Sequence, residues 1–456
     1  MSVTNLVQQL RENFNSGITR PLNYRRQQLT GIIRLLKEHE QEIKTALYQD
    51  VGKPDIEAFG AEIASTLREA EIACKYLAKW TKPKSVRTPL FAQPGKSRIY
   101  FEPLGVVLII APWNYPVQLL LAPLIGAIAA GNCAVVKPSE LAPATSTLLA
   151  SLLPHYVDPA CLSVVTGGAP ETTALLNERF DYIFYTGNGQ VGRLVMTAAA
   201  KHLTPVTLEL GGKSPCIIDQ DIDLEVTARR IIFGKFYNAG QTCIAPDYIL
   251  VHEAIESTLL QQLKKAIQDF YGSDIQKNRD YARIINTRHF QRLMQLLKNS
   301  GDVVIGGQAD EKDRYLAPTI LSNVPTNSPV MDEEIFGPIL PVLKVKNIDE
   351  AITFVNARTK PLALYLFTKN DRVKSDVLER TSSGGVTINH VMMHVMIPGL
   401  PFGGVGASGM GGYHDQATFE TFSHRKSVLA KPFILDTDIV YPPYSKLKMK
   451  LLRWLI

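Results

Sequence analysis

The chain contains few cysteines for its length, and they do not occur in pairs. Five cysteines, Cys74, Cys133, Cys161, Cys216 and Cys243, are spread over 456 residues. Because no two of them form a C-x-x-C pair, the sequence predicts neither a disulfide framework nor a zinc site, and no metal is expected. This cysteine usage favours a reducing compartment, and we expect a cytoplasmic protein.

The chain also has few long apolar runs, and its net charge is small. The most apolar stretch, PVQLLLAPLIGAIAAG from Pro116, contains Gln118 and Pro123. It is shorter than the roughly 20 apolar residues of a membrane-spanning helix, and we expect a buried helix. The first residues, MSVTNLVQQLREN, lack the basic start and apolar core of a signal peptide. The net charge of +6 is small and forms no basic and aromatic stripe, so no nucleic-acid partner is expected.

The sequence does contain a regular alternation of short apolar runs and helix-compatible stretches, over a length that suggests two or three domains. From Glu102 the runs GVVLIIAPW, NCAVVKPS, CLSVVTGG and DYIFYTGN are each followed by such a stretch. Continuous apolar runs separated by helices predict parallel strands covered on both faces, which is the doubly wound α/β pattern. A second series begins near PVTLELGGKSPCIID and ends at GGVTIN, with the boundary near Leu208.

Two stretches belong to neither series. Residues 86–103, VRTPLFAQPGKSRIYFEP, predict a hairpin that leaves the body of the protein, and residues 424–432, HRKSVLAKP, offer a partner strand. A protruding hairpin of this kind suggests a subunit contact. The expected organisation is a nucleotide-binding domain (1–85 and 103–207), a second domain (208–412), bridging strands (86–102 and 413–432) and a tail (433–456).

A glycine motif and an acidic residue follow one another in the first series. YTGNGQVG places Gly187, Gly189 and Gly192 as G-x-G-x-x-G between a strand and a helix, where backbone N–H groups can approach phosphate. A tight glycine turn is the alternative, because the motif follows the fourth strand and not the first. About 20 residues later, Glu209 is placed to be a ribose ligand, a general base or a solvated residue at a strand end.

Three further residues lie at strand ends, where open α/β sheets place ligands, and a cysteine outside the strands is a fourth candidate. Asn114 in APWNYP directly follows a strand, so its amide could donate to an oxyanion or stabilise a turn. Lys137 and Glu140 in KPSE could hold ribose hydroxyls or cap the next helix. Cys243 stands in YNAGQTCIAP, whose polar and glycine-rich residues suit neither a core helix nor a core strand. It is either an inert buried thiol or a nucleophile among backbone donors.

Seven motifs resemble those of the aldehyde dehydrogenase superfamily in order and spacing: PWNYP, KPSE, YTGN, LELGGKSP, GQTC, EEIFGP and PFGGVGASGMG. The resemblance covers essentially the whole chain and is strongest to the class 3 branch, which includes the fatty aldehyde dehydrogenases. It implies two doubly wound parallel-sheet domains with a small β-hairpin oligomerisation element. It also implies NAD(P)-dependent oxidation of aldehydes to carboxylic acids.

The same resemblance implies a role for each matching residue. Cys243 would be the nucleophile, Glu209 the general base, and Asn114 the side-chain donor of the oxyanion hole. The KPSE pair would hold the adenosine ribose, which settles Glu209 as the base. The cofactor-binding residues implied are Trp113, Lys137, Glu140, Gly187, Asn188, Gly192, Glu334 and Phe336, and Tyr115 would contact the substrate.

The resemblance leaves the substrate and the cofactor ratio open. NAD is expected, because Glu140 would repel the 2′-phosphate of NADP, although class 3 members often accept both. Apolar aldehydes such as fatty aldehydes or retinal fit, and a homodimer is implied. A coenzyme A-acylating enzyme is disfavoured by Glu209, and a catalytically silent scaffold by the presence of all three catalytic residues. A cysteine hydrolase is disfavoured because no histidine in the motifs pairs with the thiol.

The tail ends in the basic amphipathic segment YPPYSKLKMKLLRWLI. At the helical angle of about 100° per residue, Lys446, Lys450 and Arg453 share a face. The apolar residues on the remaining surface are Leu447, Leu451, Trp454, Leu455 and Ile456. Such a segment is too short to span a membrane and predicts peripheral membrane contact through 433–456. The alternative is a helix packed on its own subunit.

Overall fold

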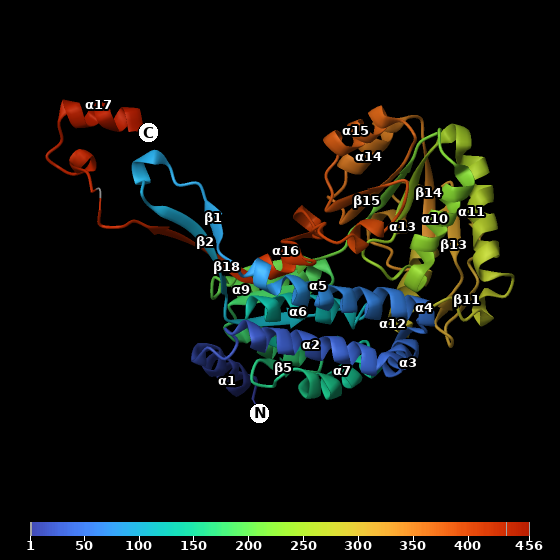
Figure 1. Ribbon diagram of the computed structural model, residues 1–456. Coiled ribbons are helices and arrows are strands. Elements are labelled where there is room, and N and C mark those ends of the chain that lie inside the picture. The colour runs from blue at the N-terminus through green and yellow to red at the C-terminus, as the bar shows by residue number, and fades with distance from the viewer. Residues whose placement is uncertain (1, 435, 456) are drawn as a thin grey trace.

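The computed structural model describes residues 2–434 and 436–455, and its first sheet is mainly parallel. Five parallel strands lie in the order β7-β6-β3-β4-β5, and the short β17 pairs antiparallel with β7 at the edge. Helices cover both faces, as the doubly wound prediction requires (Figure 1). The strands are β3 Val106–Ile110, β4 Cys133–Lys137, β5 Leu162–Val164, β6 Tyr182–Thr186, β7 Val206–Glu209 and β17 Gly409–Met410.

The second sheet has seven strands in the order β10-β13-β14-β9-β8-β15-β16. All pairs in it are parallel except the edge pair of β10 and β13, which run antiparallel. The prediction of two doubly wound domains is therefore confirmed. The strands are β8 Pro215–Ile218, β9 Tyr248–His252, β10 Asp302–Ile305, β13 Thr319–Ser322, β14 Ile339–Val345, β15 Ala363–Phe367 and β16 Gly385–Ile388, with a separate pair β11 Ala309–Asp310 and β12 Tyr315–Leu316.

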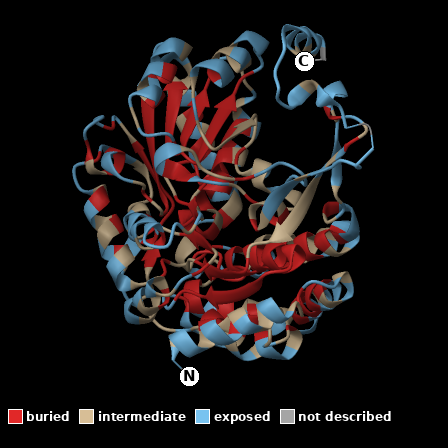
Figure 2. Cartoon of the chain, turned by 90° about the vertical axis from the view of Figure 1, so that its left-hand side faces the viewer, coloured by how far each residue is buried: buried red, intermediate tan, exposed pale blue. Residues whose placement is uncertain are grey.

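The helices bury apolar faces against these sheets, and Figure 2 shows buried residues concentrated in the sheets and the adjoining helices. Helix α6, Gln118–Ala130, is buried at every position from Leu119 to Ala130, as expected for the most apolar run. The other helices are α1 Val3–Ser16, α2 Leu22–Glu38, α3 Glu40–Val51, α4 Asp55–Glu57, α5 Ser65–Trp80, α7 Pro143–Tyr156, α8 Ala169–Asn177, α9 Gly189–Ala200, α10 Leu224–Phe236, α11 Glu256–Tyr271, α12 Thr287–Leu297, α13 Pro329–Asp332, α14 Ile348–Asn356, α15 Asp371–Arg380, α16 Gln416–Thr421 and α17 Lys446–Leu455.

The chain crosses between the two sheets slightly later than expected. The expected boundary at 207/208 falls inside β7, which belongs wholly to the first sheet, and the crossover occupies residues 210–214. Likewise β17 lies in the first sheet, and α16, in the expected bridging segment 413–432, packs against α6. Apolar periodicity identifies β7 and β8 as strands but carries no information about which sheet each one joins.

The hairpin and its partner strand form a three-stranded antiparallel sheet that leaves the body (Figure 1). Strands β1 Lys84–Val86 and β2 Lys96–Pro103 form the hairpin, and β18 Ser423–Ala430 pairs with β2 along its whole length. This pairing confirms the predicted strands. No residue of β1, β2 or β18 is fully buried, so the sheet presents open faces within the described chain.

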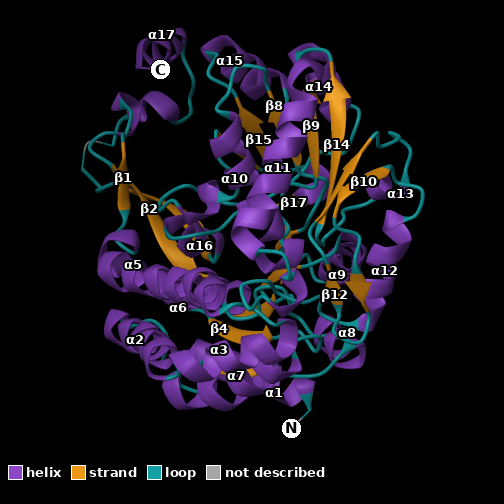
Figure 3. Ribbon diagram, turned by 90° about the vertical axis from the view of Figure 1, so that its right-hand side faces the viewer, coloured by secondary structure: helices purple, strands orange, loops and turns teal. Residues whose placement is uncertain are grey.

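Helix α17 lies away from both domains, beyond the hairpin (Figures 1 and 3). Its Leu447 and Trp454 side chains are 67% and 77% exposed, so the helix does not bury its apolar residues on its own subunit. The side chain of Leu455 and all of Ile456, which the sequence analysis placed on this surface, lie outside the described residues. Across the described ranges, no helix is both long and apolar enough to cross a membrane.

Candidate active site

A tight turn presents Cys243 between the two domains. The 3₁₀ turn Tyr237–Gly240 follows α10 directly, and Asn238 and Ala239 adopt left-handed φ angles of 53° and 51°. Gly240 also has a positive φ of 75°, and a Cβ atom there would lie 2.3 Å from the carbonyl oxygen of Gly337. The sequence NAG therefore supplies the only residue type that fits at 240, and the strained backbone marks a candidate functional site.

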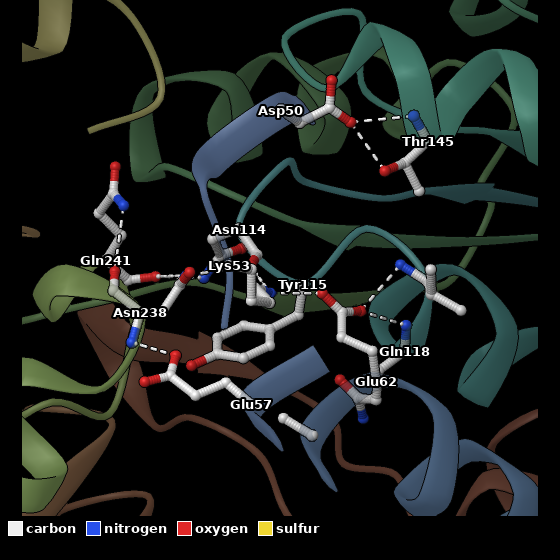
Figure 4. A network of polar contacts seen from close by, with 12 residues as sticks. Asp50, Lys53, Glu57, Glu62, Asn114, Tyr115, Gln118, Thr145, Asn238 and Gln241 are labelled. Atoms are coloured by element: carbon white, nitrogen blue, oxygen red, sulfur yellow. Dashed lines mark hydrogen bonds and ion pairs between the residues drawn. The ribbon is translucent and has the colours of Figure 1, made fainter. Parts of the chain in front are cut away.

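The polar residues before Cys243 are buried and hold this turn to the loop after β3 (Figure 4). Asn114 Nδ2 donates to the Gln241 carbonyl oxygen at 3.0 Å, and Asn238 Nδ2 donates to both the Asn114 and Gln241 carbonyl oxygens at 3.1 Å. Gln241 Nε2 donates to the Asn238 carbonyl oxygen at 3.0 Å, and Ile285 N donates to Gln241 Oε1 at 2.9 Å. The polar residues of this motif thus hold the loop in place and do not expose the thiol.

The Cys243 thiol is half-buried, which differs from the accessible thiol expected from the sequence. Burial raises its pKa, and the charges of Glu334 and Glu209 raise it further. The thiol is therefore protonated at neutral pH, unlike reactive cysteines that lie beside cations. A nucleophilic Cys243 needs a base within reach, and the two carboxylates are the groups whose charge it experiences.

Glu209 ends β7 and is placed between Thr186 of β6 and Gly409 of β17 in the sheet register. Glu209 is only 2% exposed, so it is not a solvated residue at a strand end. Neither carboxylate oxygen has a hydrogen-bond partner among the described residues. Desolvation by burial raises its pKa well above the ordinary value, so the group is suited to take up a proton.

Asn114 and Tyr115 lie on the loop after β3, as predicted, and both are buried. The Asn114 amide uses one N–H for Gln241 and retains a second, because an amide nitrogen carries two donors. The Tyr115 hydroxyl hydrogen-bonds Thr242 Oγ1 at 2.7 Å, beside Cys243. Tyr115 thus supports the loop that carries Cys243.

At the end of β4, Lys137 and Glu140 form the expected pair. The buried Lys137 Nζ donates to Glu140 Oε2 at 2.8 Å, and the Glu140 side chain is 47% exposed. Partial burial acts to raise the pKa of Glu140, but the hydrogen bond from Lys137, a backbone hydrogen bond and the Lys137 charge together outweigh burial and lower the pKa. An ionised, accessible carboxylate fits the two hydroxyls of a ribose.

The glycine motif serves close packing as well as a helix start. A Cβ at Gly187 would lie 2.2 Å from Tyr185 Oη, and one at Gly192 would lie 2.9 Å from Leu210 Cδ2. The Asn188 side chain accepts a hydrogen bond from Val191 N at 3.0 Å and caps α9. Asn188, expected to bind cofactor, therefore has its side-chain oxygen engaged, although the N-terminus of α9 suits a phosphate.

The EEIFGP motif brings Glu334 and Phe336 to the site from the segment between α13 and β14. A Cβ at Gly211 would lie 2.0 Å from Glu334 Oε2, so the carboxylate lies directly on this glycine. Burial and then Asp247 raise the pKa of Glu334 to about 8. Phe336, with a φ of 48°, meets the Trp113 ring edge-on at 5.3 Å.

Several buried polar residues near the site carry no motif and were missed by the sequence analysis. His289 meets the other side of Trp113 at 5.2 Å, and burial followed by the Arg292 and Arg288 charges lowers its pKa to about 4. Lys53 and Glu62 are fully buried beneath the site. Lys53 stands between a glycine and a proline, as a loop residue would, and Glu62 looks like an ordinary charged helix position, so no local signal marks their burial.

A sequence profile of the aldehyde dehydrogenase family matches residues 1–428. The chain belongs to the aldehyde dehydrogenase family. It is 51% identical over 443 residues to the aldehyde dehydrogenase named dimeric and NADP-preferring from Canis lupus familiaris, covering 97% of this chain and 98% of that protein. It is 52% identical over 445 residues to aldehyde dehydrogenase family 3 member A2 from Mus musculus, with coverage of 97% and 92%.

A solved structure agrees with this assignment. The substrate-bound aldehyde dehydrogenase AldH of Staphylococcus aureus superposes with a TM-score of 0.97 at 46% identity and covers 100% of this chain and 99% of that one. The expected class 3 resemblance is thus confirmed by the named relatives. The protein is an NAD(P)-dependent aldehyde dehydrogenase that oxidises aldehydes to carboxylic acids.

Proposed function

We propose that this aldehyde dehydrogenase works through a thioester on Cys243 and takes apolar aldehydes of medium to long chain. The observation that carries the catalytic part is the burial of Glu209, whose partnerless carboxylate acts on the half-buried Cys243 thiol. An uncompensated buried carboxyl costs stability, so its retention at this place favours a role in proton transfer.

The first step is addition of Cys243 Sγ to the carbonyl carbon of the aldehyde. The raised pKa of the thiol requires that a carboxylate take its proton, and burial raises the pKa values of both Glu209 and Glu334, which makes each a stronger base once it is ionised. The resulting oxyanion of the thiohemiacetal accepts from the free N–H of Asn114 Nδ2 and from the backbone N–H of Cys243. These donors stabilise charge that appears only as the reaction proceeds.

When bound, NAD(P) would supply the acceptor for the hydride that leaves the thiohemiacetal carbon as the thioester forms, and residues on three elements would hold it. Lys137 and Glu140 would bind the adenosine ribose, the start of α9 the pyrophosphate, and Glu334 and Phe336 the nicotinamide riboside. Glu209 then accepts a proton from the water that attacks the thioester, which releases the acid and restores the thiol. Because Glu209 provides this base, hydrolysis is favoured over transfer of the acyl group to coenzyme A.

An apolar surface beside the nucleophile loop supports an apolar substrate. Phe233 on α10 is 44% exposed and its ring meets that of Tyr237 at 5.4 Å, at the start of the turn before Cys243. A Cβ at Gly234 would lie 2.2 Å from Val391 Cγ2, so the segment after β16 packs on the same helix. That segment exposes Met393, Met396, Ile397 and Leu400. Methionine-rich surfaces adapt to apolar ligands of varied shape, including fatty aldehydes and retinal.

The open three-stranded sheet and the detached tail support two assembly proposals. The exposed faces of β1, β2 and β18 suit a homodimer contact, and the relative from Canis lupus familiaris is named dimeric. The basic α17, with its exposed Trp454 and Leu447, suits peripheral contact with a membrane. Light scattering of the purified protein tests the first proposal, and a monomer would contradict it.

Replacement of the proposed nucleophile tests the catalytic assignment. Cys243→Ala removes the thiol, and we expect loss of NADH formation with any aldehyde. Cys216→Ala is the matched control, because Cys216 is a fully buried cysteine in β8 of the second sheet. Normal turnover by the Cys243 variant would refute the assignment.

A further inference from the structure

Three charged side chains gather beneath the active site, and the proposed mechanism uses none of them. Lys53 and Glu62 are 0% exposed and Glu57 is 8% exposed. Burial of an ion pair is expensive and often gives no net stability compared with an apolar substitute. Its presence directly under the Asn114 loop therefore points to a role other than stability.

The Lys53–Glu62 pair contacts the Asn114 loop at its centre. Lys53 Nζ donates to Glu62 Oε1 at 2.5 Å and to the Asn114 carbonyl oxygen at 2.8 Å. The same ammonium lies 4.2 Å from the centroid of the Tyr115 ring, a cation–π contact (Figure 4). Asn238 Nδ2 is the second donor to the Asn114 carbonyl, so both of its lone pairs are used.

Glu62 also grips the end of that loop. Its Oε2 accepts from Val117 N and Gln118 N, each at 3.0 Å, where α6 begins. Val117 caps α6 without a side-chain hydrogen bond of its own, so the carboxylate of Glu62 serves as the cap from another segment. A carboxylate at a helix N-terminus is favoured by the free N–H groups and the helix dipole.

An unusual helix presents these residues. Glu62 lies in the π-helix Ala58–Ala64, and Glu57 immediately precedes it. Glu57 Oε2 accepts from Asn238 N at 2.8 Å, so it supports the nucleophile loop while Glu62 supports the Asn114 loop. The i→i+5 pattern of a π-helix brings residues five apart to the same side, and such segments occur often at functional sites.

We propose that Lys53, anchored by Glu62, is the positioning residue for the oxyanion donor Asn114. With its carbonyl fixed by two donors and the following helix capped, the Asn114 backbone has one orientation, which sets the direction of its amide. Catalytic donors need placement to within about 0.5 Å, because small displacements weaken transition-state stabilisation. This inference rests on the role of Asn114 proposed above.

The test replaces both members of the pair. Lys53→Met alone would leave a buried, unpaired carboxylate and destabilise the fold, whereas Lys53→Met with Glu62→Gln removes both charges and keeps an acceptor for the N-terminus of α6. We expect the double variant to fold and to keep the wild-type KM for NAD. Its kcat should fall by about 10- to 100-fold, which is no more than the fall in kcat when an oxyanion donor itself is removed.

A neighbouring ion pair provides a matched control. Lys44 Nζ contacts Glu40 Oε1 at 2.5 Å on α3 and lies 5.1 Å from the Phe59 ring centroid, and it makes no contact with Asn114 among the described contacts. Lys44→Met with Glu40→Gln should keep kcat. Equal losses in both double variants would show a general effect of charge removal and overturn the proposal.

A cycle with Asn114→Ala separates this inference from the function on which it rests. If Lys53 acts through Asn114, the triple variant Lys53→Met/Glu62→Gln/Asn114→Ala should have the same kcat as Asn114→Ala alone. Additive losses of kcat in the triple variant would overturn the inference. Normal kcat in Asn114→Ala would instead overturn the proposed oxyanion hole. If the double variant is unstable, Lys53→Arg alone keeps the buried charge pair but changes the position of the donor to the Asn114 carbonyl oxygen, and it should lower kcat in the same direction. An unchanged kcat in that variant would also overturn the inference.

Discussion

The Nδ2 amide of Asn114 donates to the carbonyl oxygen of Gln241 at 3.0 Å, and so joins the loop after β3 to the loop that carries Cys243. The first loop belongs to one sheet and the second leads into β9 of the other. The proposed oxyanion donor and nucleophile are therefore held relative to each other by direct contact between the two domains.

The pH dependence of turnover should report the proposed base. Because burial raises the pKa of Glu209, its carboxyl is protonated at low pH and becomes a base only as the pH rises through that raised pKa. We expect kcat to increase with pH across the range above the ordinary glutamate value, and Glu209→Gln to be slow and to lose this increase. A Glu209→Gln variant with the wild-type profile would contradict the role of Glu209.

Glu140 should favour NAD over NADP. Its ionised carboxylate, held by Lys137, would repel the 2′-phosphate of NADP at the ribose site. Glu140→Gln keeps a hydrogen-bonding side chain and removes the charge, so we expect the ratio of the two KM values to shift toward NADP by several-fold. A wild-type enzyme that strongly prefers NADP would argue against this placement of the ribose.

The apolar surface beside Cys243 should appear in substrate preference. We expect kcat/KM to rise with chain length in a series from acetaldehyde to dodecanal, by up to about tenfold for each two methylenes that become buried. Retinal, measured alongside, tests whether a bulkier apolar chain is accepted. If kcat/KM does not change with chain length, the exposed methionines after β16 have a packing role and do not bind the substrate.

The tail should bind lipid through exposed apolar residues. A protein lacking 433–456, and a full-length Leu447→Ser/Trp454→Ser variant, should both fail to float with anionic liposomes, whereas wild type floats. Lys264→Ser on α11 removes a positive charge elsewhere and is the control. Flotation that persists in the deletion variant would place membrane contact outside the tail.

The sequence predicts the strands because β3, β4 and β6 are apolar runs, and the candidate site residues lie at or just after strand ends: Asn114 follows β3, Lys137 ends β4 and Glu209 ends β7. Lys53 and Glu62 escaped prediction because their burial depends on contacts with Asn114 and α6, which are distant in sequence. The i→i+5 turn that orients Glu62 has no signature in local periodicity.

Asn188 shows that one residue can carry two signals. An asparagine directly before a helix is a strong N-cap signal, and the structure uses it in this way. The surrounding glycines drew the interpretation toward cofactor binding. The crossover at residues 210–214 lies a few residues beyond the expected boundary near Leu208, because the pattern of strands and helices does not show which sheet a strand joins.

The most direct test of the covalent account is to trap the intermediate. In Glu209→Gln the Glu334 carboxylate remains to take the Cys243 proton, so this variant should add an apolar aldehyde to Cys243 and form the thioester in the presence of NAD, but hydrolyse it slowly. Intact-mass spectrometry of this variant after mixing should show the protein plus one acyl group, located on Cys243 by peptide mapping and absent from Cys243→Ala. No adduct in Glu209→Gln, together with undiminished turnover, would contradict the account.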